Sequence, residues 1–175
     1  MAKNLVNLDA LIVREDLHKR PDDTVPPATK TRDIKITELT TDSLFLQSLR
    51  KPDFQRETAS WDSENVVDLV ESFLKGDFVP SIILWFSADG KSFVIDGAHR
   101  LSALIAWVHD DYGDRRTSLE FFSNFIPTEQ KKIAEKTRNQ MNSRVGSYEQ
   151  IKQAGKSPKT SEEKHVKYSR NAGIL

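Results

Sequence analysis

The spacing of apolar residues along the chain predicts a mixture of helices and strands. In "DSENVVDLVESFLKGD" apolar residues recur at helical spacing between a capping Asp or Ser and Gly76, so this stretch predicts an amphipathic helix. The apolar runs "PSIILWFS" and "KSFVID", joined by "ADG", predict a β-hairpin, and "LSALIAWV" after them predicts a second helix. Further predicted elements are a strand in "DIKITEL" and helices in "TTDSLFLQSLR", "IPTEQKKIAEKTRNQMN" and "GSYEQIKQAG". Together these elements predict an α+β fold, a small mixed sheet surrounded by helices.

The two ends of the chain differ from this central part. Residues 1–32 are expected to form an N-terminal helix, with Leu5 and Leu8 at helical spacing, and then the Pro-rich linker "RPDDTVPPATKTR". That helix could dock on a partner protein. The folded domain is expected over residues 33–155. Residues 156–175 contain few apolar side chains, so we expect a polar, basic tail that is mobile or leads into a longer protein.

The composition is that of a globular protein with extended polar segments. Of the 175 residues, 37% are hydrophobic and 30% are charged. There is no cysteine, which excludes disulfides, thiolate zinc sites and a thiol nucleophile. The sequence also lacks a signal peptide and an apolar run long enough to span a membrane. We therefore expect a cytoplasmic protein without a membrane partner.

The formal net charge of zero hides a strong asymmetry between the two halves of the chain. Residues 1–114 contain 13 Lys and Arg against 20 Asp and Glu, whereas residues 115–175 contain 13 against 6. A chain that is basic only toward its C-terminus could place that part on nucleic acid or on its own acidic half. A solvated basic helix and tail is the simpler alternative, and all three stay open at this point.

The stretch "VIDGAHR" contains the strongest chemical signal. A strand that ends at Asp96 is followed by Gly97, which can adopt a positive φ, and then by Ala98 and His99 at the start of a helix whose first amides have no intrahelical partners. Such a helix end attracts anions, and Arg100 adds a planar fork that suits phosphate oxygens. The pattern therefore predicts a phosphate-binding turn. The alternative is a structural turn in which Asp96 caps the helix and the polar side chains are solvated or paired.

The surrounding sequence resembles a known family. "DGAHRLSALIAWV", preceded by "FQRETASWDSENVVDLVESFLKGDFVPSIILW", resembles the ParB/sulfiredoxin superfamily. It is most similar to the branch marked by a DGQHR or DGQQR motif, found in restriction and phage-defence proteins such as the GmrSD type. The resemblance covers about residues 33–154. It implies a ParB/sulfiredoxin-like fold that binds a nucleotide at the turn.

The resemblance also implies roles for individual residues. Asp96 would orient the neighbouring arginine, hold Mg²⁺ through water, or act as a base toward water. The catalytic residues would be Asp96, Arg100 and Arg56, although an ordinary loop arginine is the alternative for Arg56. The sulfiredoxin cysteine and the Glu of the ParB box are both replaced by Ala98, which excludes the first activity and argues against a partition clamp. The nucleotide-binding set would be Gln55, Arg56, Gly97, Ala98, His99 and Arg100.

Two functions from different classes follow from these patterns. The first is a domain that binds a nucleoside triphosphate with Mg²⁺ and hydrolyses it in a phage-defence, restriction or DNA-modification system. The second is a non-catalytic module that binds DNA or a partner protein through its basic C-terminal half.

Other polar residues give weaker signals. Trp61 is interpreted as packing rather than base stacking. A metal site formed by His109, Asp110, Asp111 and Asp114 is possible in principle, but acids that follow a helix are more simply a solvated loop. A basic run that could contact nucleic-acid phosphates is interpreted as a solvent-facing helix; it comprises Lys131, Lys132, Lys136, Arg138 and Arg144.

Overall fold

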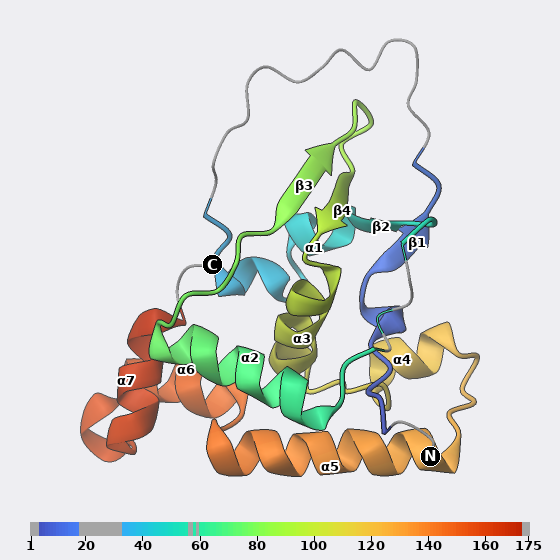
Figure 1. Cartoon of the computed structure of the whole chain (residues 1–175). Coiled ribbons are helices and arrows are strands. Elements are labelled where there is room, and N and C mark those ends of the chain that lie inside the picture. Colours follow the sequence, from blue (N-terminus) through green and yellow to red (C-terminus); the bar gives the residue numbers. More distant parts are fainter. Residues whose placement is uncertain (1–3, 18–32, 56–57, 59, 173–175) are drawn as a thin grey trace.

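The computed structural model describes residues 4–17, 33–55, 58 and 60–172, and it contains a four-stranded sheet (Figure 1). In spatial order the strands are β1 (Val13–Glu15), β2 (Leu49–Pro52), β4 (Ser92–Asp96) and β3 (Ile83–Phe86). β2 runs parallel to both β1 and β4, whereas β3 and β4 form an antiparallel hairpin. The predicted α+β fold with a small mixed sheet is confirmed, and so is the predicted hairpin.

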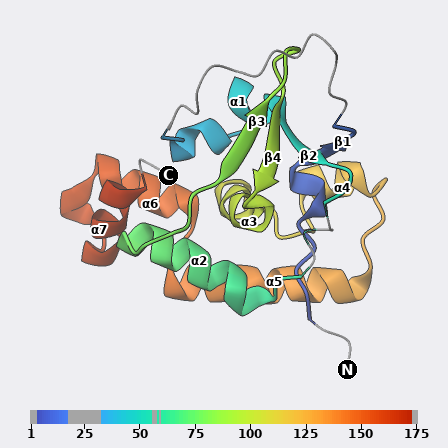
Figure 2. The same ribbon diagram turned by 45° about the horizontal axis from the view of Figure 1, so that its top comes forward.

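The helices lie mainly beneath this sheet. Figures 1 and 2 show α3 directly under the strands, α2 and α5 side by side as a lower layer, and α6 and α7 at one end of it. None of the helices in the described ranges is both long and apolar enough to cross a membrane. The α-helices are α1 (Leu44–Ser48), α2 (Ser63–Lys75), α3 (Ala98–His109), α4 (Arg116–Phe121), α5 (Thr128–Arg144), α6 (Tyr148–Lys156) and α7 (Glu163–Asn171), and the 3₁₀ helices are η1 (Asp9–Leu11), η2 (Ile36–Leu39) and η3 (Pro158–Thr160).

The helix α3 is the centre of the hydrophobic core. All of its residues from Leu101 to Trp107 are buried, so it is covered on every side rather than along one stripe. Burying each large apolar side chain contributes about 1.5–3 kcal/mol to stability. The indole Nε1 of Trp107 donates to the carbonyl of Gly146 at 2.9 Å, which satisfies the one polar atom of that side chain. The first turn of α3 is therefore held rigidly at the end of β4.

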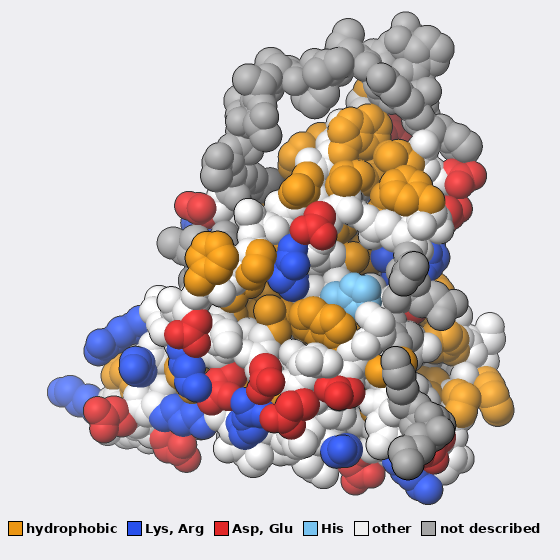
Figure 3. Space-filling model, in the orientation of Figure 1, with side chains coloured by type: hydrophobic (Ala, Val, Ile, Leu, Met, Phe, Trp, Pro, Cys, Tyr) orange, Lys and Arg blue, Asp and Glu red, His pale blue; other side chains and the backbone are white. Residues whose placement is uncertain are grey.

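The outer side of the hairpin is different. Figure 3 shows apolar side chains gathered over β3 and β4, and charged side chains of both signs over the lower helices. Ile83, Phe86 and Ile95 are all exposed on these two strands. In contrast, Val94 of β4 and Leu49 of β2 belong to the core above α3. The core therefore lies on the helical side of the sheet.

The predicted N-terminal helix is wrong. The backbone amide of Val6 donates to the carbonyl of Trp61 at 2.8 Å, and that of Leu8 donates to Thr58 at 3.3 Å. These residues therefore pair with the loop before α2 instead of forming helical bonds, and the segment continues through η1 into β1. Their apolar side chains are buried in the same core as α3. The Pro-rich part, residues 20–32, lies outside the described residues.

Two elements near residue 40 also differ from the prediction. "DIKITEL" forms η2 rather than a strand, because the Glu38 side chain accepts from the Lys35 amide at 2.9 Å and closes a tight turn. The predicted helix that follows is confirmed as α1, which Ser43 caps at the Phe45 amide. Its last predicted residues belong to β2, which sequence spacing did not reveal.

Within the expected tail, residues Glu163–Asn171 form the helix α7, so the expectation of a mobile tail is wrong for this segment. α7 packs on α6 and α2, and its Tyr168 is buried. The side-chain amide of Asn171 donates through Nδ2 to the carbonyl of Leu74 at 2.9 Å, near the C-cap Gly76 of α2. One buried aromatic ring and one capping amide thus anchor a segment that is otherwise polar.

The basic half of the chain lies in part on the acidic half. Arg144 of α5 reaches across to three carboxylates of α2, and Arg138 joins two carboxylates that follow α3. The hydrogen bond from Arg144, the largest influence on the Glu71 carboxyl, lowers its pKa below the usual range. Of the three explanations offered for the charge asymmetry, pairing within the chain is therefore confirmed for these two arginines. Arg144 bonds to Glu64, Asp68 and Glu71, and Arg138 bonds to Asp110 and Asp114.

A buried ion pair connects three separate parts of the chain. Lys51 of β2 is fully buried, and its ammonium donates to the Asp9 carboxylate and, at 3.2 Å, to the Thr58 hydroxyl. Asp9 also accepts from the Thr58 amide at 3.1 Å and from Arg14 at 3.2 Å. Burial raises the pKa of Asp9, but the hydrogen bonds from Lys51, Thr58 and Arg14 outweigh it and lower the pKa from 3.8 to about 2.

Replacing Asp9 should reveal this pair through its pH dependence. A depressed carboxyl pKa contributes stability that is present above the unfolded pKa near 4 and is lost as the pH falls toward 2. The Asp9→Asn substitution leaves Lys51 buried without a counter-charge, so we expect it to lower the free energy of unfolding by about 3 kcal/mol at pH 7. The difference from the wild type should shrink by about 2 kcal/mol between pH 5 and pH 2 in urea titrations.

The exposed Asp42 is the matched control for this prediction, because Asp42→Asn makes the same chemical change without burial. Its effect should stay within about 0.5 kcal/mol at every pH. A stability difference for Asp9→Asn that is constant over the whole pH range would contradict the assignment.

Candidate functional site

The candidate site is the turn between β4 and α3. Gly97, with φ 92° and ψ 15°, is the N-cap of α3 and supplies no side chain to cap it. The first intrahelical bond is made by the Leu101 amide, which donates to Gly97 at 2.9 Å. By contrast, Asp62 caps α2 and Ser147 caps α6. The first turn of α3 is thus a helix N-terminus without a side-chain cap, which favours an anion.

Arg100 lies directly against this turn. Its Nη2 donates to the Asp96 carboxylate at 2.7 Å and to the carbonyl of Ser81 at 3.1 Å. A Cβ atom on Gly97 would approach Nη2 to 3.1 Å and Ile82 Cγ1 to 3.0 Å, so the guanidinium packs where a side chain is absent. The Nε atom of Arg100 is shielded from solvent and has no hydrogen-bond partner within the described part of the chain. One donor of a positively charged group is therefore buried and unpaired beside the turn.

Asp96 is the exposed partner of this arginine. Its side chain is 60% exposed, against 20% for Arg100. The pair spans one helical turn, and the Asp96 oxygen that accepts from Arg100 is Oδ2. The prediction that Asp96 orients Arg100 is consistent with this contact.

His99 points toward the loop before α2. Its Nε2 lies 2.7 Å from the hydroxyl of Ser60, and its ring stacks on Trp61 with the centroids 5.7 Å apart and the planes 26° apart. Trp61 is half-buried and packs against the hydrophobic core, as expected. The histidine is thus oriented by two neighbouring residues of one loop.

Gln55 secures the same loop to the sheet. Its side-chain amide donates to the carbonyls of Val94 at 2.6 Å and Ile95 at 2.8 Å, immediately before Asp96. The structure therefore brings Gln55 to the predicted turn, where its amide group positions the end of β4. Arg56 lies outside the described residues, so its predicted place at the phosphates stays a prediction.

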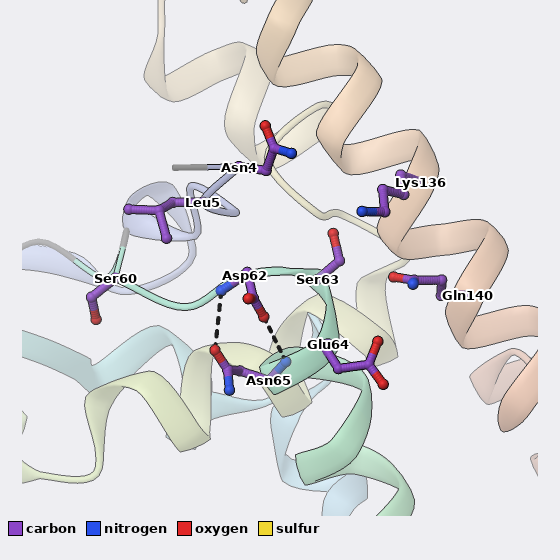
Figure 4. Close-up of a pocket in the computed structure, with 9 residues that line it drawn as sticks. All are labelled: Asn4, Leu5, Ser60, Asp62, Ser63, Glu64, Asn65, Lys136 and Gln140. Atoms are coloured by element: carbon purple, nitrogen blue, oxygen red, sulfur yellow. Dashed lines mark hydrogen bonds between the residues drawn. The ribbon is translucent and has the colours of Figure 1, made fainter. Parts of the chain in front are cut away.

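A cavity of about 430 Å³ lies beside the turn, between the N-terminal segment, the start of α2 and α5. Ser60, which contacts His99, is also one of its walls. Figure 4 shows polar side chains from all three segments around it. The lining consists of Asn4, Leu5, Ser60, Asp62, Ser63, Glu64, Asn65, Lys136 and Gln140.

The acidic residues after α3 do not form a metal centre. Asp111 is buried and accepts from the amides of Gly113 and Ser118. Burial raises the pKa of its carboxyl, but the hydrogen bonds outweigh this effect and lower the pKa overall. Asp110 and Asp114 bond to Arg138 instead. No three His, Asp or Glu side chains are grouped to hold a metal ion anywhere in the described ranges. The cluster has a structural role, ending α3 and connecting it to α5.

Sequence reasoning missed three contributors to the site. Ser60 orients His99, the Ser81 carbonyl holds Arg100, and Arg14 donates to the Gln55 carbonyl at 2.8 Å. Neither a serine in a loop nor a backbone carbonyl carries a sequence signal. The short apolar run from Leu11 to Val13 was the one local feature compatible with the strand that contains Arg14.

These features define the class of protein as an α+β domain built around a strand–glycine–helix turn that carries an arginine. The particular family follows from comparison: the model for "GmrSD restriction endonuclease, N-terminal domain" matches residues 36–173. The chain belongs to this family, and the expected relation to GmrSD-type restriction and phage-defence proteins is confirmed. No curated protein and no solved structure matches the chain. Membership of the wider ParB/sulfiredoxin superfamily stays a prediction.

The packing of Arg100 against Gly97 can be tested with two alanine substitutions. Gly97 and Gly90 both have positive φ, 92° and 82°, but a Cβ at Gly90 would meet nothing within 4 Å. We expect Gly90→Ala to lower the free energy of unfolding by about 1 kcal/mol through backbone strain alone. Gly97→Ala should cost about 2 kcal/mol or more, because Ile82 and Arg100 must also move; equal costs in urea unfolding would contradict the close packing.

Proposed function

We propose that the turn from Asp96 to Arg100 binds the phosphates of a nucleoside triphosphate. With Mg²⁺ the domain then hydrolyses the nucleotide as part of a restriction system that acts on DNA. One observation carries the proposal: Arg100 is held against Gly97 at the uncapped start of α3, with its Nε shielded and without a partner. The family to which the chain belongs supports the restriction context.

A phosphate group suits this turn for two physical reasons. The dipole of α3 favours an anion at its N-terminus by roughly 0.3–1 kcal/mol, and the first amides add direct hydrogen bonds. An unpaired buried donor such as Arg100 Nε costs about 1–3 kcal/mol, which a phosphate oxygen would recover once the guanidinium turned Nε toward it. Arginine is also the side chain best shaped for phosphate recognition.

The exposed carboxylate of Asp96 fits a Mg²⁺ ion beside those phosphates. Mg²⁺ keeps several waters and takes one or two protein carboxylates together with substrate phosphates, so a single exposed Asp is sufficient. When bound, the ion would neutralise phosphate charge and polarise the phosphoryl oxygens.

The protein groups would then promote hydrolysis by positioning and charge. Asp96 accepts a proton from the attacking water, whose oxygen forms a bond to the terminal phosphorus as the bond to the leaving phosphate oxygen breaks. Arg100 donates to the phosphoryl oxygens as negative charge shifts to the leaving group. His99, fixed by Ser60 and Trp61, adds a donor or acceptor at the same turn.

A second candidate is a DNA-binding or protein-interaction module. Three exposed lysines at the beginning and middle of α5 favour DNA contact, because none has an ion-pair partner in the part of the chain that the structure describes: Lys131, Lys132 and Lys136. Arg138 and Arg144 are already paired, which weakens this surface. If DNA affinity falls steeply with salt while nucleotides change nothing, the second candidate is favoured.

Removal of Arg100 should weaken nucleotide binding. We expect Arg100→Ala to reduce the affinity for nucleoside triphosphates with Mg²⁺ about 10-fold to 100-fold in calorimetric titration, because a charge-assisted hydrogen bond contributes about 1.5–3 kcal/mol. Arg116→Ala is the control, since Arg116 is 90% exposed and pairs with Glu120 within α4. The proposal fails if the wild-type protein binds none of the four common triphosphates.

Hydrolysis should depend on Asp96 more than binding does. Asp96→Asn keeps an oxygen that can accept from Arg100 but removes the carboxylate that would both hold Mg²⁺ and accept the proton, so phosphate release should fall by a factor of about 10²–10⁴, more than the affinity for the nucleotide falls. An assay of released phosphate, run beside the calorimetric titration, separates the two effects. Unchanged turnover in the variant would exclude Asp96 as the base.

A further inference from the structure

We infer that the cavity beside the turn receives the base of the nucleotide, and that it selects a base with an amino group next to an unprotonated ring nitrogen. Adenine and cytosine have this arrangement on their Watson–Crick edge. The inference rests on the proposed function, because it assumes that the triphosphate is held at Gly97 and Arg100. It adds the position of the base and the chemical reason for choosing among bases.

The position of the cavity supports the first part. Ser60 lines the cavity and its hydroxyl contacts His99, which immediately follows Gly97 and Ala98 in the turn. The cavity and the turn are therefore linked through Ser60, while no residue of the turn itself lines the cavity. A volume of about 430 Å³ lies within the range of ordinary small-molecule sites.

The selectivity follows from two side chains of α5. Gln140 Oε1 is shielded from solvent and has no hydrogen-bond donor among the described residues. Lys136 lies one helical turn earlier on the same wall, is exposed, and has no ion-pair partner in the described chain. The cavity wall thus contains an unsatisfied acceptor, which the Gln140 side chain must turn outward to meet a ligand, beside an exposed charged donor (Figure 4).

The acceptor of Gln140 and the donor of Lys136 can form hydrogen bonds with some bases and not with others. The amino group of adenine or cytosine would donate to Gln140, and the adjacent ring nitrogen would accept from Lys136. Uracil and hypoxanthine present the reverse order, a carbonyl oxygen and a ring N–H, which would face the oxygen and the ammonium with like groups. Leaving a buried polar atom such as Gln140 Oε1 unpaired is the usual source of strong discrimination.

The other cavity walls suit the sugar. The Asp62 carboxylate accepts from the Asn65 amide through Oδ1 at 3.0 Å and caps α2. A carboxylate has lone pairs beyond this one bond and can accept from a ribose hydroxyl. Ser63 has its hydroxyl 2.8 Å from that of Thr137, so its place in the wall is fixed by α5.

The test compares nucleotides that differ only at the base edge. Affinities are measured for ATP against ITP and CTP against UTP, with inorganic tripolyphosphate as a probe of the turn alone. We expect the wild type to prefer at least one amino base over its partner by about 10-fold or more. Gln140→Leu should reduce that ratio to near one, while the affinity for tripolyphosphate stays the same.

Lys136→Met is a second variant at an exposed position, so it keeps the inference testable if Gln140→Leu does not fold. It should reduce the same ratio at least about 3-fold. Lys132→Met and Asn139→Leu are the controls, because both residues are exposed on α5 and neither lines the cavity. These controls should leave the ratio unchanged.

The possible failures are distinguishable. Nucleotides that bind through Arg100 with a ratio insensitive to Gln140 and Lys136, or with a preference for the oxo bases, would overturn the cavity inference and leave the proposed function standing. Tripolyphosphate that binds as tightly as every nucleotide would do the same. Failure of tripolyphosphate and of all nucleotides to bind would remove the proposed function and this inference together.

Discussion

The buried ion pair between Lys51 and Asp9 is the interaction on which the arrangement of the site depends. It joins the N-terminal segment, the second strand of the sheet and, through Thr58, the loop before α2. Breaking such a pair leaves a buried charge that costs about 3–5 kcal/mol. The same loop contains Gln55, which bonds to the end of β4, and Ser60, which orients His99. A structural ion pair thus positions groups that reach the turn.

A second constraint comes from the core below the sheet. Because α3 is buried on all sides, its axis and its first turn cannot shift without opening the core. Gly97 then lets the chain pass from β4 into α3 and leaves space that Arg100 occupies. The turn is therefore preorganised: the arginine is already ordered, and a bound anion would not have to fix a mobile side chain.

Much of the fold could be predicted where local signals and packing agree. The helices α2 and α3 and the hairpin have strong periodicity and clear ends at Gly76 and "ADG". The predictions failed where a few long-range contacts decide. The N-terminal residues pair with the loop at Trp61, and the polar C-terminal segment is anchored by Tyr168 and Asn171. Propensity cannot anticipate a partner that lies far away in the chain.

The sequence by itself determined the turn and its chemistry, because the residues from Asp96 to Arg100 are contiguous and a glycine between a strand and a helix has few alternative conformations. Only the tertiary structure decided what surrounds that turn. Ser60 and Ser81 carry no sequence signal, and they contact His99 and Arg100 because folding brings separate segments to one place. Local backbone geometry is encoded over a few residues, whereas the walls of a site depend on how distant elements pack.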